Sequence, residues 1–204
     1  MGAAGALLPL RAGAQALGMV QDLSGTVTLN DFPLTRSSAL LPGQTIRTGD
    51  DGRVWFTLGS DAFFLRPGSS LRLQTVSTAR PRELVIDFLR LVTGALGATF
   101  AKGMRRSLVT PTATIGIRGT GVYIEASREL TYACTCFGAT ELISTPTGSM
   151  MESVAVSTEN HQARYISRDP VMNMRIARAG LERHTNEEMI RLESMVGRPN
   201  PFRS

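Results

Sequence analysis

The segment Val109–Gly138 reads VTPTATIGIRGTGVYIEASRELTYACTCFG, and the rest of the chain is best interpreted outward from it. Apolar and polar residues alternate on both sides of the short segment Ser127–Glu129, a pattern typical of two β-strands joined by a turn. The first strand contains the glycines Gly116, Gly119 and Gly121. Glycines inside a strand indicate a bulge, a bend or the close approach of another backbone. The segment therefore predicts a β-fold with a sharp corner at its centre.

Turn signals recur about every ten residues in the N-terminal half of the chain, as expected for a fold of many short strands. Asp50-Asp51-Gly52 predicts a hairpin, and Gly59-Ser60-Asp61 and Pro67-Gly68-Ser69-Ser70 predict two further turns. Later strands are expected at Glu83–Leu91, Leu96–Phe100, Thr140–Ser144, Ser153–Ser157 and Ala163–Ser167. We therefore expect a mainly β fold, and the spacing does not choose among a sandwich, a roll and a solenoid.

A helix is expected near the C-terminus. Thr185-Asn-Glu-Glu188 matches a capping box, and apolar residues then follow at helical spacing up to Gly197. These signals predict a helix over Asn186–Val196, and a second helix is expected over Val171–Gly180. Residues 169–204 are therefore expected to form a helical appendage to a β domain at 17–168.

The first sixteen residues, MGAAGALLPLRAGAQA, resemble the apolar and cleavage regions of a secretory signal. They end in Ala14-Gln15-Ala16, which predicts cleavage after Ala16 and a periplasmic or secreted location. No window of the sequence is apolar over a length that could cross a membrane, so no transmembrane segment is expected.

Three pieces of the chain resemble the FecR domain family. The segment Thr110–Thr120 (TPTATIGIRGT) resembles the signature of that domain, and Gly43–Gly49 and Leu58–Ser69 resemble pieces that precede it. The resemblance covers about residues 25–156. It implies a periplasmic sensing or protein-interaction module in bacterial envelope signalling. The printed sequence has no counterpart of the sigma-factor-binding part of the family's regulators, so control of a sigma factor by this segment alone is not expected.

The resemblance places the expected contact with an envelope protein or a small ligand near Arg118 and Thr120, between the glycines. A catalytic function is not expected, because the sequence has no nucleophile elbow, no phosphate-binding glycine loop and no zinc-protease helix motif. The net charge is +5, but the arginines are spread along the chain and aromatic residues are few, so nucleic-acid binding is not expected. The one basic cluster, Lys102–Arg106, is expected to protect a strand edge or to contact an anion or a partner.

Cys134 and Cys136 are the residues whose pattern does suggest a chemical function. On an extended strand, residues i and i+2 point to the same face, so the two thiols should lie side by side. Three interpretations stay open: two small side chains packed in a core, a disulfide or redox pair, and half of a soft-metal site such as one for zinc. His161 or His184 would complete a metal site, and His161 is expected first because it lies in the β region. Apart from such a zinc ion, no cofactor is expected.

Overall fold

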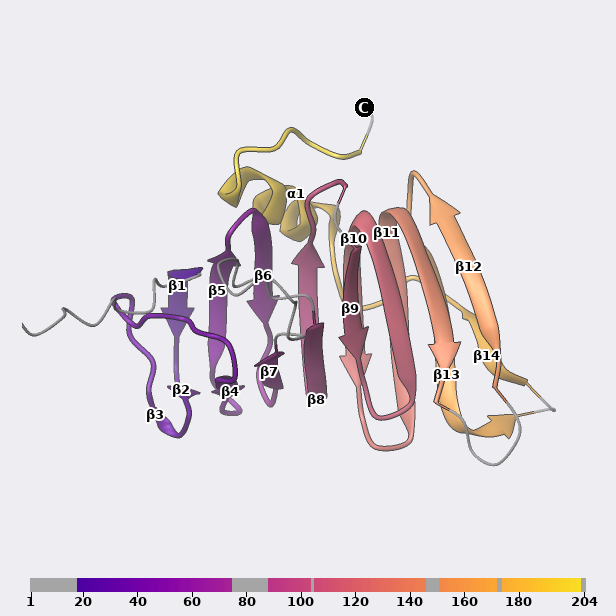
Figure 1. Ribbon diagram of the computed structural model, residues 1–204, viewed down its shortest axis with the longest axis horizontal. Helices are drawn as coiled ribbons and strands as arrows, with labels where there is room; N and C mark the ends of the chain where they lie inside the picture. Colours follow the sequence, from indigo (N-terminus) through magenta and orange to yellow (C-terminus); the bar gives the residue numbers. More distant parts are fainter. Residues whose placement is uncertain (1–17, 75–87, 104, 146–150, 172–173, 203–204) are drawn as a thin grey trace, which may run out of the picture.

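The computed structural model describes residues 18–74, 88–103, 105–145, 151–171 and 174–202 (Figure 1). These residues form one hydrogen-bonded sheet of fourteen strands and one α-helix, α1 (Asn186–Met195). The strands are β1 (Gly18–Ser24), β2 (Val27–Leu29), β3 (Phe32–Pro33), β4 (Thr45–Thr48), β5 (Arg53–Leu58), β6 (Asp61–Leu65), β7 (Ser70–Gln74), β8 (Phe88–Thr99), β9 (Arg105–Val109), β10 (Ala113–Ala126), β11 (Leu130–Ser144), β12 (Ser153–Thr158), β13 (Gln162–Val171) and β14 (Met174–Ala179).

Three long strands, β8, β10 and β11, change partners halfway along their length. The first part of β8 pairs with β7 and β9, and its second part pairs with β6 and β10. Similarly, β11 pairs first with β13 and then with β12. A glycine with positive φ lies at each change of partner, namely Gly94 (87°), Gly119 (55°) and Gly138 (85°). Glycine adopts this conformation without the steric cost that a Cβ would add, so the sheet can bend at these positions.

The bend in β10 also changes which side chains face the core. Before it, the odd-numbered Ile115 and Ile117 are buried in the main core, whereas after it the even-numbered Val122 and Ile124 are buried in the same core. The register is irregular between Arg118 and Gly121, and one displaced residue is enough to exchange the two faces of a strand. The two halves of the sheet therefore enclose one apolar core.

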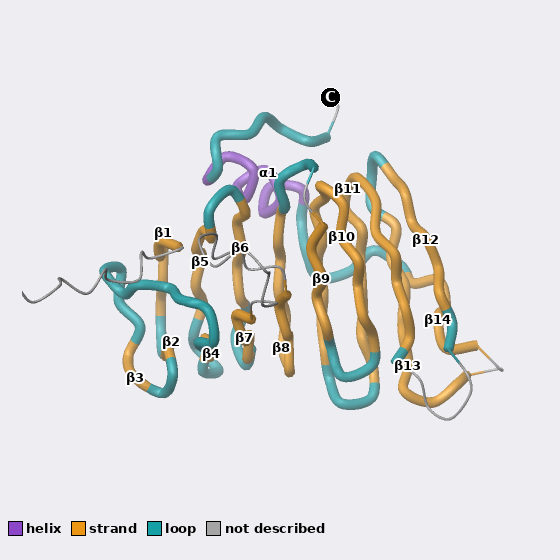
Figure 2. The backbone as a smooth tube through the Cα atoms, viewed as in Figure 1, coloured by secondary structure: helices purple, strands orange, loops and turns teal. Residues whose placement is uncertain are grey.

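A second apolar cluster lies on the other face of the sheet and is covered by α1. Met189 and Leu192 of the helix are fully buried there, against side chains that include Phe64 and Tyr123. Figure 2 shows this single helix in purple beside the ends of the orange strands β5, β6 and β8. Among the described residues, no helix is long and apolar enough to span a membrane.

The mainly β fold with a C-terminal helix is confirmed. The capping box is also confirmed: the Glu188 backbone N–H donates to the Thr185 hydroxyl, and the Thr185 N–H donates to the Glu188 carboxylate. The second helix, predicted over Val171–Gly180, is wrong, because Met174–Ala179 forms the strand β14. There the hydrogen-bond ladder with β13 outweighs a weak local preference for helix. The signal segment 1–16 and the turn at 146–148 lie outside the described residues.

The expected basic loop Lys102–Arg106 is only partly a loop, because β9 begins at Arg105. Arg106 is buried, and its Nε donates to the Asp61 carboxylate at 2.9 Å. The interpretation of this segment as a surface feature is therefore wrong for Arg106. Lys102 and Arg105 are exposed.

We expect Gly119→Val to destabilise the fold by about 2–3 kcal/mol. Gly119 has φ 55°, and a Cβ added there would lie 2.8 Å from the Lys102 Cα atom, a backbone atom that cannot rotate away. Urea unfolding measures the loss. Arg118→Ala is the matched control, because Arg118 is exposed and its removal should change the stability by less than about 0.5 kcal/mol. Equal stabilities for the two variants would mean that the corner is unstrained.

Candidate metal centre

The strand β11 places the two cysteines of the chain on one face of the sheet. Both are free thiols and fully buried, and both belong to the apolar cluster under α1. Here β11 lies between β10 and β13, with Cys134 opposite Tyr123 on one side and Ala163 on the other. The prediction that both thiols share a face is confirmed.

His161 lies in the turn that joins β12 to β13. Its φ is 34°, an uncommon value for a residue with a side chain, and its backbone N–H donates to the Cys136 carbonyl at 2.9 Å. This hydrogen bond ties the turn to β11. The imidazole ring therefore lies beside the cysteines, with its Nδ1 atom 3.6 Å from the Cys134 sulfur.

His184 comes from the segment Gly180–Thr185, which joins β14 to α1 and which we call the strap. Its ring stacks on Tyr123 with the ring centres 4.6 Å apart and the planes 15° apart. Its Nε2 atom lies 3.4 Å from the Cys136 sulfur and 3.1 Å from the His161 Nδ1 atom. The strap thus brings a fourth metal-ligating side chain to the three on the sheet.

These four side chains form what we call the four-ligand cluster: Cys134, Cys136, His161 and His184. Their ligand atoms all lie within 4.8 Å of one another. In a tetrahedral zinc site with bonds of about 2.3 Å to sulfur and about 2.05 Å to nitrogen, neighbouring ligand atoms would be about 3.3–3.8 Å apart. The three distances given above, from 3.1 to 3.6 Å, are close to this range. The cluster therefore has the donor types of a tetrahedral zinc site, and three of its six ligand-atom distances are close to those of such a site.

The outer nitrogen of each histidine is held by an oxygen acceptor. Nε2–H of His161 donates to the Asn186 side-chain oxygen at 2.6 Å, and Nδ1–H of His184 donates to the Glu182 carbonyl at 2.9 Å. A neutral imidazole carries hydrogen on only one nitrogen, so if both rings were neutral and held in this way, their inner nitrogens would face each other as lone pairs. Lone pairs 3.1 Å apart repel unless a cation or a proton lies between them. Outer hydrogen bonds of this kind are also what orient histidines around a bound metal.

The two thiols differ in acidity because of their neighbours. The hydrogen bond with Cys136, helped by His161 and His184, lowers the pKa of Cys134 to about 4 although burial opposes this. Burial raises the pKa of Cys136 well above its usual value, and the hydrogen bond with Cys134 adds to this. The Cys134 hydrogen bond raises the pKa of His161 in turn. One thiolate is therefore favoured at neutral pH, and a thiolate is the form that binds a metal.

The structure separates the two residues expected near the corner of β10. Arg118 is exposed and lies opposite Arg105 of β9, in a small hollow that Lys102 also lines. Thr120 is fully buried, and its hydroxyl donates to the Gly121 carbonyl at 3.3 Å. Because no part of Thr120 reaches solvent, we keep only Arg118 as a candidate surface contact. Neither residue belongs to the four-ligand cluster.

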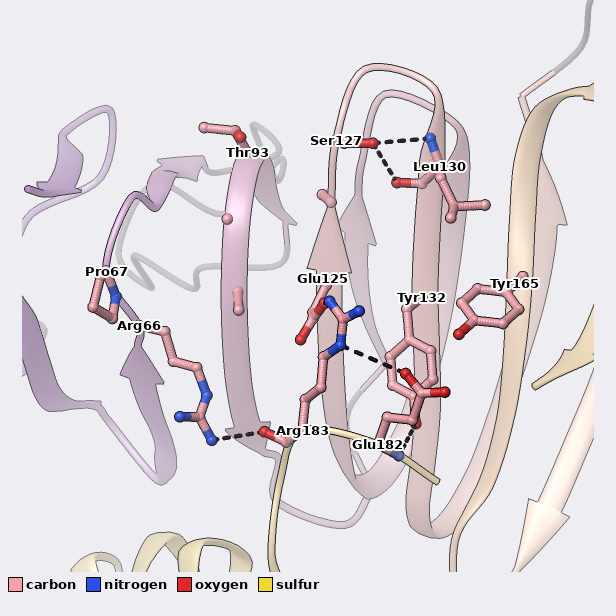
Figure 3. A pocket seen from close by; sticks show the side chains of 13 residues that line it. Arg66, Pro67, Thr93, Glu125, Ser127, Leu130, Tyr132, Tyr165, Glu182 and Arg183 are labelled. Carbon is pink, nitrogen blue, oxygen red and sulfur yellow. Dashed lines mark hydrogen bonds and ion pairs between the residues drawn. The ribbon is translucent and has the colours of Figure 1, made fainter. Parts of the chain in front are cut away.

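A cavity of about 580 Å³ lies on the same face of the sheet, beside the strap (Figure 3). Its walls carry charged and aromatic side chains, among them Arg66, Glu125, Tyr132, Tyr165 and Arg183. The charges are paired across the cavity wall, since Arg183 bonds Glu125 at 2.7 Å. No local sequence signal pointed to this cavity, because its walls come from strands far apart in the chain.

Comparisons with known proteins show the fold and no more. No family model and no curated protein matches the chain. Two crystal structures, both described as a "putative anti-sigma factor" from Parabacteroides distasonis, are similar to it with TM-scores of 0.51 and 0.50 and 15% sequence identity. Each match covers 68% of this chain and 60% of the other, so this chain corresponds to less than two thirds of either neighbour.

Proposed function

We propose that this chain is a non-catalytic, zinc-binding module of bacterial envelope signalling. One observation carries the zinc assignment. The chain has only two cysteines and two histidines, and the fold brings all four into one cluster. If the two cysteines only packed in the core, the histidines beside them would have no role. If the cysteines formed only a disulfide or redox pair, the orientation of the two histidine rings would have no role. A set of two thiolates and two imidazoles is characteristic of structural zinc sites, which have no open coordination position for a substrate.

The signalling role is supported by the structural neighbours and by the sequence resemblance. The structural neighbours are described as an anti-sigma factor, and the sequence resembles the FecR domain. Both suggest a regulatory module that contacts another envelope protein or a small ligand and does no chemistry. The predicted signal segment adds a periplasmic or secreted location. Arg118, exposed in its basic hollow, is the proposed contact residue on the β surface.

Elemental analysis of protein purified without a chelator and without a histidine tag tests the zinc assignment. We expect about one zinc per chain, and two thiols that react with a thiol reagent only after acid or a chelator has removed the ion. The double variant Cys134→Ser/Cys136→Ser should contain no zinc. Thr135→Ser is the matched control, because Thr135 lies between the cysteines on the same strand and points to the other face, where it bonds Thr140.

Two other results would each contradict the proposal. Protein without zinc that reacts with thiol reagent only after unfolding would indicate simple core packing. Protein without zinc that shows two thiols only after a reductant would indicate a disulfide and redox chemistry. The signalling role is tested separately, by comparing the envelope proteins that wild-type protein and Arg118→Ala retain from a periplasmic extract.

A further inference from the structure

The strap is attached to the sheet by hydrogen bonds, by the ion pair of Arg183 with Glu125 and by the stacking of His184 on Tyr123. Its residues from Gly180 to Arg183 are exposed, and Leu181 in particular leaves 61% of its surface in solvent. The Tyr132 hydroxyl donates to the Gly180 carbonyl at 3.1 Å and accepts from the Glu182 N–H at 3.2 Å. Solvent-exposed hydrogen bonds and ion pairs contribute little to stability, because water competes for the same groups. Residues 180–183 are all exposed, so none of them holds the strap down by burial in the core.

The helix that follows is attached differently. Met189 and Leu192 are fully buried, and the Glu193 carboxylate, also buried, bonds Arg198 at 2.6 Å. Burying two such apolar side chains stabilises the docked helix much more than exposed hydrogen bonds stabilise the strap. The helix can thus stay docked while the strap opens. Within the strap, His184 is the one residue that a bound zinc ion would hold.

The strap also forms one wall of the 580 Å³ cavity. Glu182 and Arg183 line it from the strap side, and the remaining walls, including Arg66 and Tyr165, come from the sheet (Figure 3). The Arg66 guanidinium bonds the Arg183 carbonyl at 2.8 Å, so one side of the cavity is joined to the strap directly. Movement of residues 180–183 would therefore change the shape of the cavity.

From these contacts, and resting on the proposed zinc site, we infer that zinc binding fixes the strap and thereby forms the wall of the cavity. Cys134 and Cys136 lie on β11, and the hydrogen bond from the His161 N–H to the Cys136 carbonyl ties the third ligand to the same strand. The fourth, His184, lies in the strap, of which residues 180–183 are exposed. Zinc occupancy therefore controls the cavity: with zinc the strap is closed over the sheet, and without zinc it opens. A ligand that needs Glu182 or Arg183 would bind only to the zinc-loaded protein.

Hydrogen exchange followed by mass spectrometry measures this directly on the full chain, with zinc and after chelation. We expect backbone amides of residues 180–185 to exchange at least about tenfold faster without zinc, because local opening then costs little. Peptides from β10 and from α1 should change much less. Slow exchange in β10 shows that the sheet remains folded in every sample.

Two histidine variants at saturating zinc distinguish the loss of the strap's own ligand from the loss of a ligand outside the strap. His161→Ala leaves zinc on Cys134, Cys136 and His184, so the strap should stay protected. His184→Ala leaves zinc on the sheet alone, so the strap should exchange as fast as in the zinc-free protein. If wild-type protein binds zinc but its strap exchanges equally with and without it, the inference fails and the zinc assignment stands. Equal protection in the two variants would also overturn it, and a wild-type protein that binds no zinc would overturn both.

Discussion

Zinc-loaded protein should unfold at a temperature about 10 °C higher than the same protein after chelation. A ligand present at about a thousand times its dissociation constant stabilises the folded state by about 4 kcal/mol. In a domain of this size each kcal/mol raises the melting temperature by about 2–4 °C. The effect should be large because zinc joins β11, the turn at His161 and the strap at one point. Thermal melts with and without added zinc measure it.

The serine variants provide the control for this shift. Cys134→Ser/Cys136→Ser exchanges two sulfur ligands for hydroxyls, which bind zinc poorly, so its melting temperature should not respond to zinc. Its melting temperature should be close to that of chelated wild-type protein, within the small cost of burying two hydroxyl groups. A double variant that gained as much from zinc as the wild type would place the ion elsewhere in the chain.

Asp61→Ala should destabilise the fold by about 3–5 kcal/mol, the cost typical of removing one partner of a buried ion pair. The side chains of Asp61 and Arg106 are 5% and 8% exposed, and the second Asp61 oxygen accepts the Ala101 N–H at 2.9 Å. The variant leaves the buried Arg106 charge without this carboxylate. Urea unfolding measures the change in the free energy of unfolding.

The matched control is Asp31→Asn, which removes the charge and keeps a residue type that tolerates the positive φ of 71° at this position. Asp31 also pairs with an arginine, Arg47, but its side chain is 80% exposed, and such pairs contribute about 1 kcal/mol at most. Asp61→Ala combined with Arg106→Met should recover part of the loss, because neither charge of this buried pair then remains. A cost for Asp61→Ala no greater than that for Asp31→Asn would mean that the buried pair does not stabilise the fold.

Alternation and turn residues predicted most of the sheet, because these signals are local. The bend in β10 was indicated by its glycines, of which Gly119 has the positive φ that a corner needs, whereas the bends at Gly94 and Gly138 were not predicted. The strand β14 was mistaken for a helix, because its pairing with β13 depends on where the rest of the sheet places the two segments. In short segments with a weak local preference for helix or strand, the secondary structure is decided by tertiary contacts.

The metal centre could be predicted only in part. Strand periodicity placed Cys134 and Cys136 on one face, and this needs no knowledge of the fold. Which histidine joins them depends on long-range topology, and the sequence favoured His161 because it lies in the β region. The structure brings both histidines to the thiols, since the strap folds back across β10 and β11. Only the structure shows that the four-ligand cluster contains every histidine and every cysteine of the chain.

The long stretch of chain between Cys136 and His184 has a consequence for the order in which the protein folds. His184 is 48 positions from Cys136 along the chain, whereas the β10–β11 hairpin closes through a turn of only a few residues. Local hairpins form before distant contacts, because closing a longer loop costs more entropy. The four-ligand cluster therefore becomes complete only after the sheet has formed, so a bound zinc ion would stabilise contacts absent from the folding transition state. Such contacts slow unfolding while leaving the folding rate nearly unchanged, so the proposed zinc ion would determine how long the folded protein persists.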